Sequence, residues 1–214
     1  MLIDIIAKTE QFVYKEHEKD SSGHDWHHID RVRKLALRIA QAEHKGDAFI
    51  IEMAALLHDI PDEKLNEQMD EGEKKLTRFL DTIQVSDEQK LFIIDIVKTI
   101  SFKGGNEADL HSYEAMVVRD ADRLDAIGAI GIARTFAYGG KKGQAMYNPS
   151  LPVRTNMSLN EYRNGQTSSI HHFYEKLLKL KDLLHTETAK QLAEERHQFM
   201  EMFLQQFYKE WDVD

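Results

Sequence analysis

The sequence predicts an all-α fold, a bundle of helices packed on one core. In at least six segments, apolar residues recur at intervals of three and four, the spacing that places them on one face of a helix. No segment alternates apolar and polar residues for long enough to indicate a β-strand. The chain of 214 residues has only three prolines, so long helices are possible and a turn-rich β-sandwich is disfavoured.

The first two predicted helices have short apolar stripes with recognisable ends. One stripe runs from Val32 to Ala40 and is followed by Gly46, a residue type that commonly terminates helices. The other runs from Ile50 to Leu57 and is stopped by Pro61, which cannot continue a helix. Both stripes predict helices with one buried face.

A capping box predicts the start of the third helix. Ser86 is followed three residues later by Gln89, a pair that satisfies two free amides at a helix N-terminus. The apolar stripe continues to Ile100, and Gly104 and Gly105 are expected to end the helix.

Three helices are predicted in the second half of the chain. A segment from Val117 to about Tyr138 is rich in small residues that let neighbouring helices approach closely, so we expect one long, central helix there. Apolar residues spaced three and four apart predict a further helix from Ile170 to Leu184. Thr186 is the expected N-cap of a last helix that includes Phe207.

No repeat, low-complexity segment or flexible linker divides the chain, which predicts a single domain over residues 1–214. The motif-bearing core is expected over about 23–134, a loop over 139–167 and C-terminal helices over 168–212. The loop exceeds the usual ~4–6 residues of a connection, and such loops tend to be functional or disordered. It contains four cations, Lys141, Lys142, Arg154 and Arg163, which form either an anion site or an ordinary solvated surface.

Composition excludes several classes of function. Acidic residues outnumber basic ones by 37 to 28, a formal net charge of −9, which disfavours general binding to nucleic acid backbones and to anionic membranes. The absence of cysteine excludes disulfides, thiolate zinc sites and a cysteine nucleophile. Residues 1–10 do not resemble a signal peptide, and no stretch approaches the ~20 apolar residues of a membrane span. The composition therefore indicates a reduced, cytoplasmic protein.

Four polar side chains fall on helix faces that should point into the core. His28 lies four residues before Val32, on the apolar face of its helix. His58 and Asp59 end an otherwise apolar run, where an unpaired acid is costly. Asp122 lies within the small-residue helix. Each could be structural when taken alone, as a hydrogen-bonded core histidine or the partner of an arginine. Together, two imidazoles and two carboxylates predict a metal site.

Three short motifs contain these residues: His28-Ile29-Asp30-Arg31-Val32, His58-Asp59 and Asp120-Ala121-Asp122-Arg123-Leu124. In order and spacing they resemble the HD-domain metal-dependent phosphohydrolases, over roughly residues 23–134. The C-terminal segment His171-His172-Phe173-Tyr174-Glu175-Lys176 is similar to a bacterial branch that includes nucleotide pyrophosphohydrolases. The resemblance implies a helical fold, hydrolysis of a phosphoester or phosphoanhydride, and one divalent cation held by His28, His58, Asp59 and Asp122.

A site of this composition would leave positions open on a six-coordinate ion. Mn²⁺ is the expected metal, with Mg²⁺, Fe²⁺, Ni²⁺ and Co²⁺ as alternatives, and without thiolates there is no special preference for zinc. The open positions can hold a water and a phosphoryl oxygen. Asp62 is placed where the family often has a catalytic acid, with Glu63 as the neighbouring substitute. Both could instead only solvate a helix end.

Cationic side chains are the expected phosphate ligands. Lys103 lies in a glycine turn and Arg123 lies beside Asp122, while Arg31 and Arg119 are alternatives. The other expected substrate-binding residues are Lys141, Lys142, Arg154, His172 and Lys176. His172 could equally belong to the core.

The resulting prediction is a metal-dependent phosphohydrolase acting on a nucleotide. A triphosphate has about four negative charges, and its attraction to an acidic protein needs a local positive field. This favours a nucleoside triphosphate pyrophosphohydrolase that produces a monophosphate and pyrophosphate. A nucleoside 5′-monophosphatase and a non-catalytic regulatory module remain alternatives.

A di-iron oxidoreductase and a two-metal cyclic-dinucleotide phosphodiesterase are disfavoured, because only His111 lies between His58 and Asp122. The base, the sugar and the oligomeric state are not specified.

Overall fold

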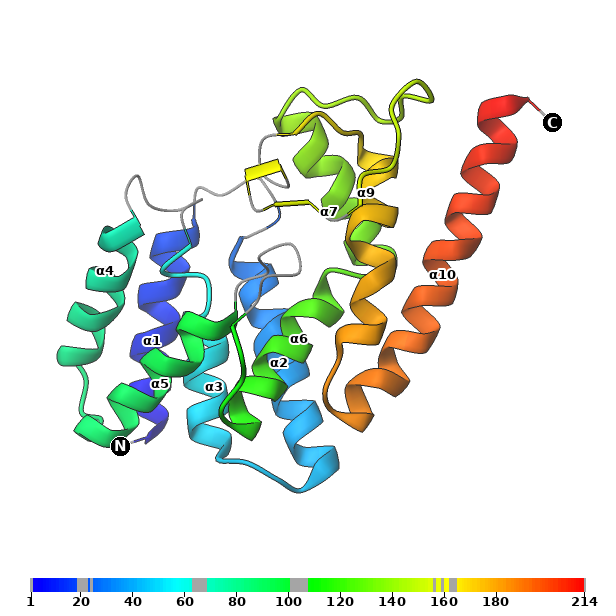
Figure 1. Cartoon of the computed structure of the whole chain (residues 1–214). Coiled ribbons are helices and arrows are strands. Elements are labelled where there is room, and N and C mark those ends of the chain that lie inside the picture. Colours follow the sequence, from blue (N-terminus) through cyan, green and yellow to red (C-terminus); the bar gives the residue numbers. More distant parts are fainter. Residues whose placement is uncertain are drawn as a thin grey trace. The chain divides into compact units, whose positions relative to one another are not determined.

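The computed structural model describes residues 2–18, 23, 25–62, 69–100, 108–155, 157–158, 160–161 and 165–213. These residues form nine α-helices and one 3₁₀-helix, and no strand occurs among them, so the predicted all-α fold is confirmed (Figure 1). Within these ranges, no helix has the length and apolarity that crossing a bilayer requires. The chain divides into two compact units: unit 1 comprises Met1–Asp20 and His24–Asp122, and unit 2 comprises Ser21–Gly23 and Arg123–Asp214.

Unit 1 is built around a short helix whose C-terminal half is buried on all sides. It comprises α1 (Leu2–His17), α2 (Trp26–Glu43), α3 (Ala48–Leu57), α4 (Met69–Asp81), α5 (Asp87–Ile100) and α6 (Tyr113–Asp125) up to Asp122. Helix α3 packs against α1, α2 and α5, and its residues from Met53 to Leu57 are inaccessible to solvent. A helix that is apolar all round belongs in such a central position.

The predicted start of α5 is confirmed, whereas Gly104 and Gly105, which were expected to end that helix, lie outside the described residues. The Ser86 hydroxyl accepts from the Gln89 amide at 3.2 Å, and the Gln89 side chain accepts from the Ser86 amide at 3.1 Å, which completes the predicted capping box. Helices α1 and α4 were not expected. In α1 the buried residues are four apart: Ile5, Thr9, Val13 and His17. Two of these four are polar, so the sequence shows no continuous apolar stripe.

The prediction of one long helix from Val117 to Tyr138 is wrong. The segment forms two helices, α6 and α7 (Gly128–Lys141), with a break at Ala126 and Ile127. Ile127 is extended and Gly128 has a φ of +75°, a conformation that favours glycine. Arg196 donates to the carbonyl of Leu124 and so satisfies one of the free carbonyls at the end of α6. The small residues that suggested close helix packing also permitted the break.

Unit 2 contains α7, α9 (Ser169–Glu175), the 3₁₀-helix η1 (Leu177–Leu183) and α10 (Glu187–Asp212). Helix α10 packs along α7 and against η1. The single helix predicted from Ile170 to Leu184 is wrong, because the α-helix ends at Glu175 and the chain continues as η1. In a 3₁₀-helix, residues three apart also share a face, so the spacing did not distinguish the two helix types. Thr186 is the N-cap of α10, as expected.

The turn between α2 and α3 depends on a glycine. Gly46 has a φ of +87°, and an added Cβ would lie 2.9 Å from Cδ1 of Ile51 and 3.0 Å from Cδ1 of Tyr113. We expect Gly46→Ala to reduce the free energy of unfolding by about 1–3 kcal/mol, measured by urea denaturation. Gly140→Ala is the matched control: it lies in helix α7 with no atom within 4 Å of the new Cβ, and should be neutral or stabilising. Equal stability of the two variants would contradict this account.

Candidate metal centre

The first turn of α2 fixes His28. Asp25 is the N-cap of the helix, and its carboxylate accepts from the backbone amide of His28 at 3.0 Å. The His28 side chain is fully buried, as expected from its place on the apolar face. Asp25 was not among the predicted site residues, although an acid directly before a helix is a recognisable N-cap.

The end of α3 brings His58 and Asp59 to one place. The helix ends at Leu57, and a turn follows in which the Asp62 amide donates to the Asp59 carbonyl at 3.0 Å. Nδ1 of His58 lies 2.8 Å from the carbonyl oxygen of Ala55. A carbonyl can only accept, so Nδ1 donates the proton and Nε2 faces the other residues of the cluster. Such a hydrogen bond is the usual way to orient a metal-binding histidine.

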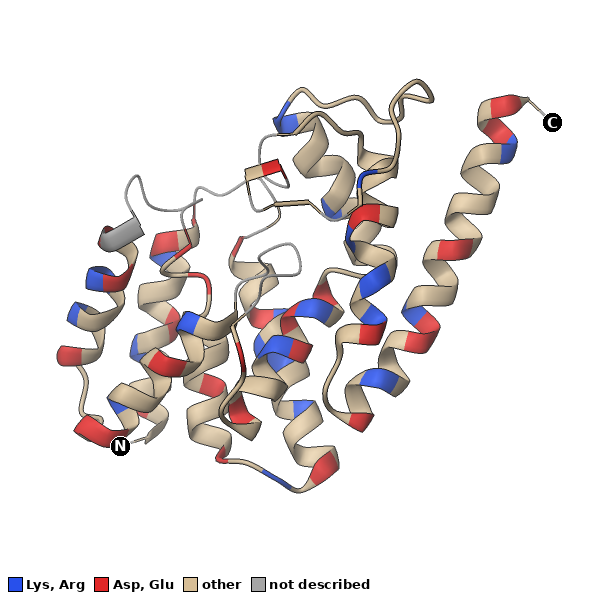
Figure 2. Ribbon diagram, in the orientation of Figure 1, with Lys and Arg blue, Asp and Glu red and all other residues tan. Residues whose placement is uncertain are grey.

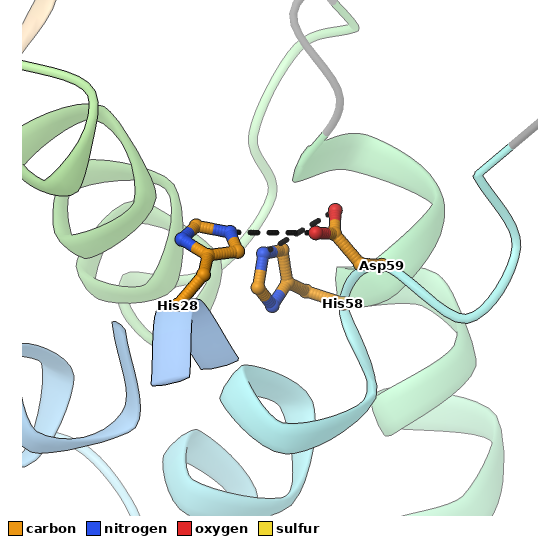
Figure 3. Close-up of side chains that lie close together, drawn as sticks. All are labelled: His28, His58 and Asp59. Carbon is orange, nitrogen blue, oxygen red and sulfur yellow. Dashed lines mark ion pairs between the residues drawn. The ribbon is translucent and has the colours of Figure 1, made fainter. Parts of the chain in front are cut away.

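The four predicted ligands come together within unit 1. His28 Nε2 lies 3.3 Å from Asp59 Oδ2 and 3.5 Å from Asp122 Oδ1. His58 Nε2 lies 3.4 Å from Asp59 Oδ1 and 3.8 Å from Asp122 Oδ1. His28, His58 and Asp59 point toward one another in Figure 3, and ligand atoms of these three all lie within 4.8 Å of one another. These three residues could hold a metal ion.

The spacing fits a shared ion better than direct hydrogen bonds. Hydrogen bonds between nitrogen and oxygen usually measure about 2.7–3.2 Å, shorter than all four separations. Two ligand atoms that each lie about 2.1 Å from one ion stand about 3.0–3.5 Å apart at tetrahedral or octahedral angles. Asp122 is the most accessible of the predicted ligands, with 27% of its side chain exposed, against 0% for His28 and 1% for His58. The cluster therefore has a buried imidazole side and a carboxylate side that solvent reaches.

The residues expected to act on water are only partly described. Asp62 is half-buried and its backbone is held against Asp59 by the turn described above. Glu63 lies outside the described residues, as do Lys103 and Arg163.

Two of the expected phosphate ligands bond to groups of the protein. Arg123 is buried and donates to the carbonyl of Leu183 within unit 2. Arg154 forms a two-pronged ion pair with Glu175: Nε donates to Oε1 at 2.8 Å and Nη2 to Oε2 at 2.6 Å. Thr167 donates to the same carboxylate at 3.0 Å. These contacts join the long loop to α9, and a substrate role for either arginine stays a prediction.

The other expected substrate-binding residues also belong to unit 2. Lys141 and Lys142 are exposed at the end of α7, and Lys142 Nζ lies 5.8 Å from the ring centre of Tyr138. His172 and Lys176 are half-buried, within and just after α9. Their roles stay predictions. Figure 2 shows acidic and basic residues intermixed along α6 and α10.

The buried pair of Arg154 and Glu175 predicts a pH-dependent stability. Burial alone would raise the pKa of Glu175, but hydrogen bonds from Arg154 and Thr167 outweigh it and hold the pKa below its ordinary value of 4.5. A carboxyl group whose pKa is lower in the folded state than in the unfolded state stabilises the fold at pH values above its unfolded-state pKa. This stabilisation is lost as the pH falls through its folded-state pKa.

We therefore expect Glu175→Gln to be less stable than wild type at pH 7 and the difference to narrow toward pH 3, measured by urea denaturation. Glu187→Gln is the control, because that side chain is 78% exposed. A difference that stays constant with pH would contradict the assignment.

Comparison with known proteins identifies the family. The HD domain matches residues 25–127, which include all four predicted ligands. The uncharacterized protein YpgQ of Bacillus subtilis is 42% identical over 193 residues, which cover 89% of this chain and 86% of YpgQ. The chain belongs to the HD superfamily.

Two crystal structures of this superfamily resemble it over nearly their whole length. An HD-superfamily hydrolase from Bacillus thuringiensis is 48% identical, with a TM-score of 0.78 and full coverage of both chains. B. subtilis YpgQ in complex with ADP is 38% identical, with a TM-score of 0.76 and coverage of 96% of this chain and 97% of YpgQ.

HD domains bind divalent metals, so the family agrees with the chemistry of the cluster. The resemblance seen in the motifs is thereby confirmed. The identity of the metal and the role of each ligand stay predictions.

Proposed function

We propose that this HD-superfamily protein is a divalent-metal-dependent phosphohydrolase that acts on nucleotides. The observation that carries the proposal is the cluster of His28, His58, Asp59 and Asp122, in which two buried imidazoles face two carboxylates at 3.3–3.8 Å. A buried set of this kind is costly unless a cation or a hydrogen-bond network compensates it. Mn²⁺ is the proposed metal.

The residues of the cluster have separate tasks in this proposal. A bound divalent ion would supply Lewis acidity toward a phosphoryl oxygen and toward water. His58 is oriented by its hydrogen bond to Ala55, and His28 by the first turn of α2. Asp122, on the accessible side, leaves that side open for a phosphate. Asp62 is proposed to orient the attacking water or to take its proton.

A nucleotide substrate is supported by a relative. YpgQ has been crystallised with ADP, so a protein that matches nearly the whole of this chain binds a nucleotide with two phosphates. We propose a nucleoside triphosphate as the substrate here, cleaved to a monophosphate and pyrophosphate. Lys141 and Lys142, both exposed in a chain of net charge −9, are the described cations proposed to attract it.

One observation favours a second candidate, a nucleoside 5′-monophosphatase. Arg123 and Arg154, expected to bind phosphates, both donate to groups of the protein. A monophosphate has about two negative charges, and a metal with few cations suffices for it.

A substrate panel distinguishes the candidates. The purified protein is loaded with each divalent metal in turn and given nucleoside mono-, di- and triphosphates, and the released phosphate species are identified. We expect pyrophosphate from triphosphates, with Mn²⁺ most effective. Release of orthophosphate from monophosphates, with triphosphates untouched, would support the monophosphatase. No turnover with any metal would support a regulatory module.

Neutralising Lys141 and Lys142 tests the proposed source of attraction. We expect the double variant with Lys141→Gln and Lys142→Gln to have a several-fold higher KM for the triphosphate and a nearly unchanged kcat. The rise in KM should be smaller at high salt. Lys179→Gln with Lys209→Gln is the control, since both side chains are exposed and the same charge is removed elsewhere in unit 2. An equal rise in KM in both double variants would mean that only net charge matters.

A further inference from the structure

Asp25 closes the first turn of the helix that carries His28. Its Oδ1 accepts from the backbone amide of His28 at 3.0 Å. Its backbone carbonyl accepts from the same amide at 3.0 Å and from that of Ile29 at 3.3 Å. The backbone of Asp25 is extended, with a φ of −77° and a ψ of 175°, as is typical of an N-cap. His28, the third residue of α2, therefore belongs to a turn that Asp25 holds with both its side chain and its backbone.

The place of His28 in this turn distinguishes it from the other predicted ligands. His58 directly follows the last turn of α3, and Asp122 lies in the last turns of α6. The first amides of a helix have no partner within the helix, so a first turn without a cap frays readily. Fraying at the start of α2 would move the backbone of His28, and its imidazole would move with it.

A metal centre tolerates little movement of its ligands. His28 Nε2 lies 3.3 Å from Asp59 Oδ2 and 3.5 Å from Asp122 Oδ1, separations that suit a shared ion. Distances between a metal and its ligands are defined to about 0.2 Å. Groups that orient a ligand from behind typically change the metal affinity 10–100-fold when they are removed. The cap of α2 is a group of this kind, because it bonds the backbone of His28 itself.

We propose that Asp25 is a positioning residue that sets the affinity of the centre for its divalent ion by capping α2 and so holding His28 in place. This role rests on the proposed function, which supplies the metal. The cause assigned here is the hydrogen bond to the His28 amide. The negative charge of the Asp25 carboxylate, which would attract a cation even without the cap, is the alternative that the experiment excludes.

Titration of the metal-stripped protein with Mn²⁺ in a calorimeter tests the proposal without substrate. We expect Asp25→Ala, which removes the cap, to raise the Kd about tenfold. Asp25→Asn and Asp25→Ser lack the charge but are good N-caps, so both should stay within about threefold of wild type. A Kd of Asp25→Ala within twofold of wild type would overturn the positioning role. A Kd of Asp25→Asn as high as that of Asp25→Ala would overturn it as well, since the charge would then be the cause.

The N-cap of α3 provides a matched control in the same unit. The Asp47 side chain accepts from the amides of Phe49 at 2.9 Å and Ile50 at 3.2 Å. His58 lies at the opposite end of this helix, so loss of the cap should not move it. We expect Asp47→Ala to lower the melting temperature of the metal-free protein about as much as Asp25→Ala does, with a Kd for Mn²⁺ within twofold of wild type. An equal rise in Kd in both variants would mean that only overall stability matters, which contradicts the proposal.

Two further results separate this proposal from folding defects and from the proposed function. If Asp25→Ala does not fold, Asp25→Gly replaces it, because glycine is tolerated at an N-cap although it forms no side-chain bond, and a several-fold rise in Kd is expected. A wild-type protein that binds Mn²⁺ but hydrolyses no nucleotide would reject the proposed hydrolase and leave the role of Asp25 valid. A wild-type protein that binds no Mn²⁺ would reject both.

Discussion

Replacement of His58 or Asp59 by alanine is expected to abolish metal binding and phosphohydrolase activity together. Both side chains lie at the end of α3, and each contributes an atom at 3.3–3.4 Å from another predicted ligand. Removing one ligand leaves the remaining buried groups without a charge that balances them, so no partial site should persist. Mn²⁺ content by mass spectrometry and the rate of nucleotide hydrolysis measure the two effects.

Metal binding is also expected to stabilise the folded protein. A metal that binds only the folded state stabilises it by about 2.7 kcal/mol at a concentration of 100 times Kd. Chelation should therefore lower the melting temperature of wild type and leave that of His58→Ala unchanged. His27→Ala is the matched control, because this histidine is exposed and adjacent to His28. Wild-type metal content and activity in His58→Ala would show that the ions bind elsewhere.

The cluster of predicted ligands could be found in the sequence because its polar side chains stand where apolar ones are expected. His28 and His58 interrupt apolar stripes of two helices, and buried polar residues are rare enough to require an explanation. The end of α3 was also visible, since His58 and Asp59 follow its last apolar residue and Pro61 comes two residues after Asp59. Sequence patterns thus predicted which polar side chains come together and why two adjacent residues, His58 and Asp59, can converge on one place.

The roles of the cations could not be predicted in the same way. Arg154 is one of four cations in a loop, and nothing near it in sequence indicates a partner. Its partner Glu175 is 21 residues away and belongs to helix α9, so the ion pair depends on tertiary packing. The break between α6 and α7 has a similar origin, because Arg196, 72 residues from Leu124, compensates for the lost helical hydrogen bonds.

The burial of Glu175 could not be predicted from the helical spacing of its neighbours. Glu175 lies between Phe173 and Leu177 in sequence, on the opposite face of the helix that their spacing predicts. In the structure its side chain is fully buried by Arg154 and Thr167. A charged residue on that face is expected to be solvated, so its burial against Arg154 could not be predicted from the helical pattern.

Asp62→Asn is expected to keep the metal and to lose on the order of 10²-fold in rate, the usual scale of general acid–base help. Asp62 is not among the predicted ligands, so its amide should leave Mn²⁺ content at the wild-type level. The turn after α3 holds its backbone amide 3.0 Å from the Asp59 carbonyl, which places the residue one turn after two of the predicted ligands. Asparagine keeps the size of the side chain but can neither take a proton nor balance a positive charge.

Three measurements decide the role of Asp62. The rate should fall on the acidic side of the wild-type pH profile, where a carboxylate base becomes protonated, and Asp62→Asn should lose this dependence. Asp62→Glu should retain part of the activity, because the carboxylate is preserved one methylene further out. Glu63→Gln is the matched control one position along the chain. An unchanged rate in Asp62→Asn with a large loss in Glu63→Gln would transfer the role to Glu63, and an unchanged rate in both would mean that neither carboxylate assists the water.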